Sequence, residues 1–122
     1  MSNEITVVYR WTAHPGNMDE LRAIYEQVRA QMEANEPGAL RMDCYFADDV
    51  GELMVHDVFA NGEALGFHLG VTAAAHFPQL MQIAKPGPFF FMGDVPADLR
   101  AAAESMNMGA VFGTHGFGFT RA

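Results

Sequence analysis

Cysteine is nearly absent from this sequence. Cys44 is the only cysteine among 122 residues, so no disulfide bond can form within the chain. That usage favours a reducing compartment, and we expect a cytoplasmic protein. The first residues carry no basic segment of the kind that opens a signal peptide. No apolar run approaches the roughly 20 residues of a membrane-spanning helix, so we expect no membrane association.

Positive charge is also scarce. Seven Lys and Arg stand against 15 Asp and Glu, a net charge of −8 at pH 7. Duplex nucleic acid and anionic membrane surfaces would repel such a chain, so we expect neither as a partner. With 50% hydrophobic and 18% charged residues, the composition excludes a disordered chain. The length suits one core, which predicts a single domain over residues 1–122.

Familiar catalytic motifs are missing too. The sequence has no glycine-rich dinucleotide loop, no P-loop and no Gly-x-Ser-x-Gly elbow. The histidines lack the close spacing of zinc ligands, so we predict no metal and no cofactor. They are His14, His56, His68, His76 and His115. Cys44 lies within a strand-like segment, on its apolar face, and we interpret it as a core residue.

What the sequence does contain is a clear succession of elements. Alternating apolar residues predict strands, and spacings of three and four predict helices. A helix follows Asn17, which is expected to cap it in a capping-box arrangement with Glu20. A second helical region, interrupted by glycine and proline, follows Asn61. The strands span residues 4–12, 39–47, 52–60 and 89–92, and the helical regions 18–35 and 62–85. This order predicts an α+β fold, ferredoxin-like βαββαβ, over a core of residues 4–93.

The sheet would have a second apolar face. Residues 52–60 carry large apolar side chains on both faces, and Phe89–Met92 is one continuous apolar run. Helices of this fold cover only one face of an open sheet. A second copy of the chain would cover the other, so we predict a homodimer.

A C-terminal extension, residues 94–122, follows the core. We predict a helix ending near Gly109 and a glycine-rich strand over 110–120. Its apolar residues predict packing on the dimer, at a sheet edge or over a pocket mouth. In the second case His115 and Phe117 would form part of a lid.

Methionine and phenylalanine are abundant, with nine and ten copies. They suit a soft core and dimer interface, or a plastic cavity for a flat hydrophobic ligand. Tyr9 and Trp11 share one strand face, where they would line such a cavity or fill the core.

Several segments resemble the antibiotic biosynthesis monooxygenase-like (ABM) family. They are Glu63–His68, Ala75–Phe77, the strand ending Val55–Phe59 and the opening strand running into Pro15–Asn17. The resemblance covers about residues 4–93. It implies a dimeric α+β barrel, with a pocket in each subunit between sheet and helices. Members include cofactor-independent oxygenases of hydroquinone-like or anthrone-like compounds and a haem-degrading branch. In that branch an asparagine stands at the position of Tyr9, and a tryptophan lies on the helix that corresponds to residues 62–85. This chain has neither residue at these places.

Three functions follow as hypotheses. The first is a cofactor-independent monooxygenase of a small phenolic, quinol or polyaromatic substrate, with His68 or His76 as the base. Its substrate-binding residues would be Tyr9, Trp11, Phe59 and Phe67, with His56 as a further polar group. The second is a non-catalytic, ligand-binding or stress-related dimer. The third is an isomerase or dehydratase of lactone-like substrates, in which base chemistry runs without oxygen.

Overall fold

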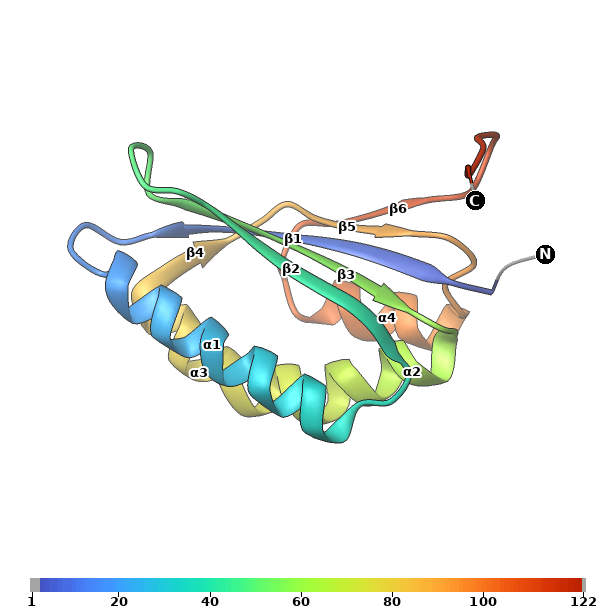
Figure 1. Ribbon diagram of the computed structural model, residues 1–122, viewed down its shortest axis with the longest axis horizontal. Helices are drawn as coiled ribbons and strands as arrows, with labels where there is room; N and C mark the ends of the chain where they lie inside the picture. Colours follow the sequence, from blue (N-terminus) through green and yellow to red (C-terminus); the bar gives the residue numbers. More distant parts are fainter. Residues whose placement is uncertain (1–2, 122) are drawn as a thin grey trace.

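The computed structural model describes residues 3–121. The chain forms strands, helices and one π-helical segment, η1, in a single succession (Figure 1). The elements are β1 (Ile5–Ala13), α1 (Met18–Asn35), β2 (Ala39–Ala47), β3 (Glu52–Phe59), α2 (Gly62–Phe67), η1 (His68–Ala73), α3 (Ala74–Ile83), β4 (Ala84–Pro86), β5 (Phe89–Met92), α4 (Ala97–Ser105) and β6 (Ala110–Gly113).

The strands form one mixed sheet with the order β2-β3-β1-β5-β6, and the short β4 also pairs with β1. The first four of these run antiparallel to their neighbours, whereas β6 is parallel to β5. All helices lie on one side of the sheet, as Figure 1 shows. The predicted ferredoxin-like α+β fold is confirmed.

Strand alternation places the core as predicted. On β1, Ile5, Val7, Tyr9 and Trp11 face the helices and are at most 5% exposed. Leu53, Val55, Asp57 and Phe59 of β3 point to the same side and are at most 1% exposed. Asp57 is therefore a carboxyl group at a position where the alternation calls for an apolar side chain.

The start of β2 departs from the predicted alternation. Its pairing with β3 shifts register between Ala39 and Arg41, which is a β-bulge. The bulge turns Leu40 outward, where it is 54% exposed, whereas Met42 and Cys44 of the same strand pack against the core. Cys44 packs against the core as expected, and burial raises the pKa of its thiol to about 12.

Both helical regions begin close to the predicted positions. The Asn61 side chain accepts a hydrogen bond from the Ala64 amide at 3.0 Å, which confirms this cap. At the start of α1, Asn17 makes no such bond and its amide donates to Glu20 instead. The second region is interrupted by a π-helical segment rather than by loops, so α2, η1 and α3 follow one another directly. The short strand β4 was not predicted, because its first residues fall at the end of the predicted helical region 62–85.

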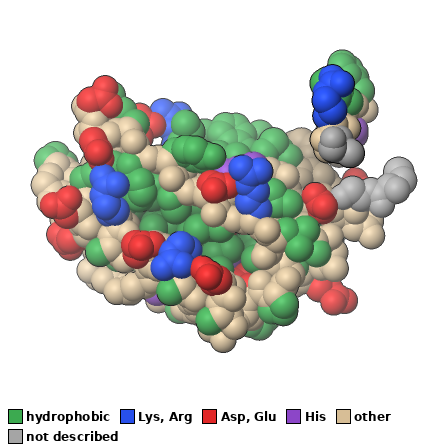
Figure 2. All heavy atoms as spheres, in the orientation of Figure 1, with side chains coloured by type: hydrophobic (Ala, Val, Ile, Leu, Met, Phe, Trp, Pro, Cys, Tyr) green, Lys and Arg blue, Asp and Glu red, His purple; other side chains and the backbone are tan. Residues whose placement is uncertain are grey.

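The outer face of the sheet carries exposed apolar side chains. Met54 of β3 and Phe90 and Met92 of β5 are 48%, 37% and 39% exposed, and Tyr45 and Val111 join them. Hydrophobic groups accordingly appear along the sheet side of the molecule (Figure 2). This is the second apolar face that the sequence predicted, and its cover by a second copy stays a prediction.

The C-terminal extension is only partly ordered into elements. Phe112 of β6 stacks on Phe91 with ring centroids 5.4 Å apart, and Arg100 of α4 lies over the Phe112 ring. The strand ends at Gly113, so the prediction of a strand to residue 120 is wrong. Beyond it Phe117 is 97% exposed, and this segment projects away from the sheet (Figure 1). Glycines at 116 and 118 offer no side chains to pack there.

Candidate functional site

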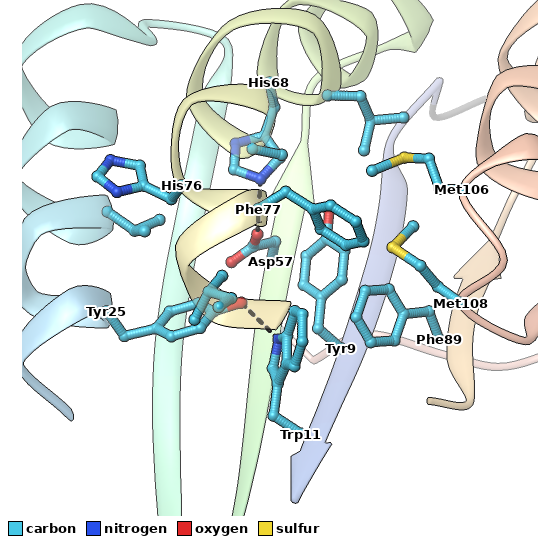
Figure 3. Close-up of a pocket in the computed structure, with 14 residues that line it drawn as sticks. Tyr9, Trp11, Tyr25, Asp57, His68, His76, Phe77, Phe89, Met106 and Met108 are labelled. Atoms are coloured by element: carbon cyan, nitrogen blue, oxygen red, sulfur yellow. Dashed lines mark hydrogen bonds and ion pairs between the residues drawn. The ribbon is translucent and has the colours of Figure 1, made fainter. Parts of the chain in front are cut away.

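A small cavity of about 30 Å³ lies between the sheet and the helices. Figure 3 shows its lining, which comes from β1, β3, β5, the helices and the connection after α4. The lining residues are Tyr9, Trp11, Tyr25, Val28, Asp57, His68, Leu69, Ala73, His76, Phe77, Leu80, Phe89, Met106 and Met108. A volume of this size holds about one or two water molecules, so an aromatic ligand requires side chains to move.

His68 is anchored at one of its ring nitrogens. Its Nδ1 lies 3.0 Å from Oε2 of Glu36, the residue that follows α1, and both side chains are at most 4% exposed. Thr72, one turn after His68, donates its hydroxyl to the same Glu36 oxygen. Burial opposes ionisation of Glu36, but these hydrogen bonds outweigh it, and its pKa lies below the ordinary value. An ionised Glu36 accepts from Nδ1–H of His68, which leaves Nε2 as the reactive nitrogen.

The other ring nitrogen faces a second carboxyl group. Nε2 of His68 lies 3.8 Å from Oδ2 of Asp57, too far for a direct hydrogen bond. Burial raises the pKa of Asp57 to about 7, although the attraction of His68 opposes the shift; Glu36 and Asp43 add repulsion. The carboxyl of Asp57 is thus an acid that retains its proton far above its ordinary pKa of 3.8.

The polar end of the cavity contains groups without partners. Among the described residues, four buried side-chain oxygens lack a hydrogen bond: the Tyr9 hydroxyl, both Asp57 carboxyl oxygens, and Oε1 of Glu36, a residue that does not line the cavity. Desolvation, followed by repulsion from Asp57, holds the pKa of Tyr9 well above its usual range, so Tyr9 stays a neutral donor. Unpartnered buried groups destabilise a fold and mark this end as a place for a polar atom.

The opposite end is aromatic and apolar. Phe89 packs edge-on against Tyr9 and Trp11, with ring centroids 4.9 Å and 5.3 Å away. Trp11 donates its indole N–H to the Tyr25 hydroxyl at 2.7 Å, which fixes the indole ring. Met106 and Met108 close this end with flexible thioethers, as Figure 3 shows.

His76 reaches the cavity through the unusual helix. Eight residues of α-helix would leave His68 and His76 about 80° apart. The π-helical segment η1 spreads each turn over more residues, so the interval comes closer to two whole turns. Both histidines line the cavity as a result. His76 donates from Nε2 to Oε1 of Gln31 at 3.1 Å, and Gln31 in turn donates to Thr72 at 3.4 Å.

The structure brings together most, but not all, of the residues that the sequence singled out. His68, His76, Tyr9 and Trp11 line the cavity. Phe59 lies behind His68, with ring centroids 5.1 Å apart. The other two predicted residues lie outside the cavity. Phe67 is 46% exposed on the helix surface, and His56 lies on the opposite face of the sheet from Asp57.

Glu36, Asp57 and Thr72 were not predicted as site residues. Asp57 had a visible signal, since it interrupts the apolar face formed by Leu53, Val55 and Phe59. Glu36 had no such signal in the sequence, because it stands in the Asn35–Gly38 segment that ends the helix. Only the folded structure brings it to His68. His115 and Phe117, which would form part of a lid in one of the two predicted arrangements, do not line the cavity, whereas Met106 and Met108 do.

Metal-binding clusters and membrane-spanning helices are both absent from the described residues. Within residues 3–121, no three His, Cys, Asp or Glu side chains are grouped to hold a metal ion. In the same part of the chain, no helix has the length and apolar character needed to cross a membrane.

A protein-family model matches this chain. The model of the antibiotic biosynthesis monooxygenase family matches residues 4–79, more than half of the chain. The chain belongs to this family. No match is found among curated proteins.

Solved structures show the same fold. MupZ from Pseudomonas fluorescens superposes with a TM-score of 0.82 at 17% identity, over 98% of this chain and 96% of MupZ. SnoaB, a cofactor-independent oxygenase from Streptomyces nogalater, gives 0.64 at 21% identity, over 74% and 91% of the two chains. Rv0793 from Mycobacterium tuberculosis gives 0.62 at 22% identity, over 72% and 89%. The MupZ match therefore includes almost all of the C-terminal extension.

Proposed function

We propose that this family member is a cofactor-independent monooxygenase of a small phenolic or quinol ring. The observation that carries the proposal is the placement of His68 in the wall of an aromatic cavity, with one nitrogen anchored by Glu36. Family membership and the fold shared with the oxygenase SnoaB support it.

In this reaction Nε2 of His68 takes the proton of the phenolic hydroxyl. The resulting anion is electron-rich and transfers electrons to dioxygen, which is the oxidant. One oxygen atom replaces hydrogen on the ring carbon as a carbonyl, and the second leaves as water. Trp11, Phe77 and Phe89 would hold the ring by stacking and exclude bulk water, which strengthens the interaction between base and substrate.

The small size of the cavity makes substrate entry a step of its own. A cavity of about 30 Å³ cannot admit a ring until its walls move. Met106 and Met108 are unbranched and turn easily, so we place the opening at this end. The working unit would be a cytoplasmic homodimer, joined through the exposed apolar face that contains Met54 and Phe90. Residues 1–122 would form one domain, with residues 94–122 as an extension of the core.

Oxygen uptake with a panel of hydroquinones and naphthols tests the proposal. We expect uptake with at least one of them, and His68→Gln should lower turnover about 100-fold or more. His76→Gln should have a smaller effect, because His76 is hydrogen-bonded to Gln31. His14→Gln is the matched control, since His14 is exposed in the turn after β1. Binding of these rings without oxygen uptake would favour the non-catalytic alternative.

A further inference from the structure

We infer that a groove between the end of α1 and the start of β2, the α1–β2 groove, binds a primary amine with a short apolar chain, whose ammonium group pairs with Glu36. The groove shares no lining residue with the cavity that contains His68. The inference goes beyond the proposed function and needs no oxygen chemistry, so either can fail without the other.

The α1–β2 groove has the size and the walls of a small-molecule site. Its volume is about 350 Å³, near the lower end of the range for ligand pockets. The β-bulge between Ala39 and Arg41 helps to form it, because it turns Leu40 away from the core and into the groove wall. Met32 of α1 and Met42 of β2 also line the groove, and their flexible thioethers adapt to the shape of a ligand. A ligand body of methylene groups therefore suits these walls.

Glu36 lines the α1–β2 groove and has one oxygen without a partner. Its carboxylate is 2% exposed, and Oε2 accepts hydrogen bonds from Nδ1–H of His68 and from the Thr72 hydroxyl. Oε1 is buried and has no hydrogen bond. A donor that enters the groove would complete the hydrogen bonding of Glu36 without displacing His68. Because Oε1 is covered, a side chain of the wall must move first, and the methionines are best suited to do so.

The charges around the groove favour a cation as that donor. Both arginines that line it are already paired with other carboxylates. The pairs are Arg29 with Glu26 and Glu33, at 2.7 Å and 2.8 Å, and Arg41 with Asp43, at 2.5 Å. In the part of the chain that the structure describes, no Lys or Arg forms an ion pair with Glu36. On the face seen in Figure 2, charged groups of both signs lie beside hydrophobic ones in the region of α1 and β2.

Glu36 is thus a buried carboxylate without a permanent cation beside it. Its hydrogen bonds hold its pKa below the ordinary value, so it is ionised at neutral pH. A neutral His68 donates a hydrogen bond to Glu36 but does not neutralise its charge. Buried charges are normally paired with an opposite charge, and a ligand ammonium group would supply it.

A primary amine meets each of these requirements. It is protonated at pH 7, as a lysine side chain is, and its ammonium group has three N–H donors. Its alkyl chain would lie against Leu40 and the two methionines. The net charge of −8 attracts cations to the chain as a whole. An anionic ligand would meet repulsion from Glu36, and a quaternary amine has no N–H to give to Oε1.

Methyl NMR of the full chain with ¹³C-labelled methionine is the first test, with hexylamine as the probe at pH 7. The signals of Met32 and Met42 should shift and saturate in the millimolar range, whereas those of Met106 and Met108, in the other cavity, should not move. Hexan-1-ol and hexanoate have the same chain without the positive charge, and should bind about tenfold more weakly or worse. No saturable shift, equal binding of hexylamine and hexan-1-ol, or shifts of Met106 and Met108 alone would overturn the inference.

Variants of Glu36 test the ion pair. Glu36→Gln should weaken hexylamine binding about tenfold or more, because the amide carries no charge. Glu104→Gln, on the exposed side of α4, is the matched control and should bind as wild type does. Equal affinities of these two variants would contradict the role of Glu36.

A second pair of variants covers the case in which Glu36→Gln does not fold. Leu40 is 54% exposed on the groove wall, so Leu40→Lys should weaken hexylamine binding and Leu40→Glu strengthen it, each about threefold. Val50→Lys and Val50→Glu make the same changes at a site that is 59% exposed and outside the groove, and should have smaller effects. Changes in one direction for both Leu40 variants, or equal effects at Val50, would refute the site.

Discussion

Nδ1 of His68 and Oε2 of Glu36 lie 3.0 Å apart and join a helical turn to the loop after α1. Glu36 does not line the cavity, whereas His68 does. The carboxylate therefore acts on a substrate only through the orientation and tautomer of the imidazole ring, and is a positioning residue.

Glu36→Gln should separate positioning from substrate binding. We expect kcat of oxygen uptake to fall about tenfold to 100-fold while KM hardly changes, because the cavity wall is intact. Steady-state kinetics on a quinol substrate measure both constants. Glu33→Gln is the control, since Glu33 is exposed and paired with Arg29. A rise in KM with unchanged kcat would contradict the positioning role.

Tyr9→Phe should not destabilise the protein. The lost hydroxyl has no hydrogen bond, so its removal relieves a desolvation penalty of about 1 kcal/mol. Thermal unfolding should show a Tm that is equal or a few degrees higher. Tyr25→Phe removes the acceptor of the Trp11 indole and should lower the free energy of unfolding by about 1 kcal/mol. A Tyr9→Phe variant less stable than Tyr25→Phe would show that the hydroxyl has a structural partner.

The pKa of Asp57 predicts a pH dependence of stability. Because its folded pKa is raised from 3.8 to about 7, the native state binds the extra proton between these values. The contribution of this extra proton to the free energy of unfolding is complete below pH 3.8. It is lost as the pH rises to about 7, at a slope of up to about 1.4 kcal/mol per pH unit. Urea unfolding of wild type and Asp57→Asn at several pH values measures this contribution as the difference between their free energies of unfolding. A difference between the two that stays constant from pH 4 to 8 would contradict it.

The outer sheet face predicts self-association. Wild type should sediment at twice 13.4 kDa at micromolar concentration. Met54→Lys, on this face, should shift the protein towards monomer because a charge would be buried in the interface. Met81→Lys introduces the same change on the exposed side of α3 and should leave the dimer intact. A wild-type monomer would refute the homodimer.

The C-terminal extension divides at Gly113. Deletion from residue 114 onward removes exposed residues such as Phe117 and should leave thermal stability unchanged. Deletion from residue 110 onward also removes β6 and uncovers Phe91, which should cost about 2 kcal/mol. If the shorter deletion lowers stability as much as the longer, or changes ligand affinity, the segment packs on the dimer or closes the pocket.

The fold was predictable because each strand carries its own pattern. The alternation in β1 and the run Phe89–Met92 mark strands without any tertiary information. The bulge at Leu40 was not predictable, because a register shift depends on how β2 pairs with β3. The end of β6 at Gly113 depends likewise on the length of β5, its only partner among the described strands.

The site was predictable in part, for a similar reason. Histidines on a helix and aromatic residues on β1 stand out in the sequence as candidates. Which histidine is anchored depends on Glu36, 32 positions away along the chain, and no local pattern joins the two. Asp57 is the exception, because a charged residue on an apolar strand face is visible in the alternation pattern itself.

The π-helical turn has a consequence for tracing the histidine pair through the family. In a relative whose second helix is regular α-helix throughout, a side chain that matches the position of His76 would stand seven residues after the first, not eight. A residue-by-residue alignment without a gap in this turn would then pair the second histidine with a neighbour about 100° away around the helix. Superposition of the backbones, with a one-residue gap inside His68–Ala73, identifies more accurately the relatives that have both histidines.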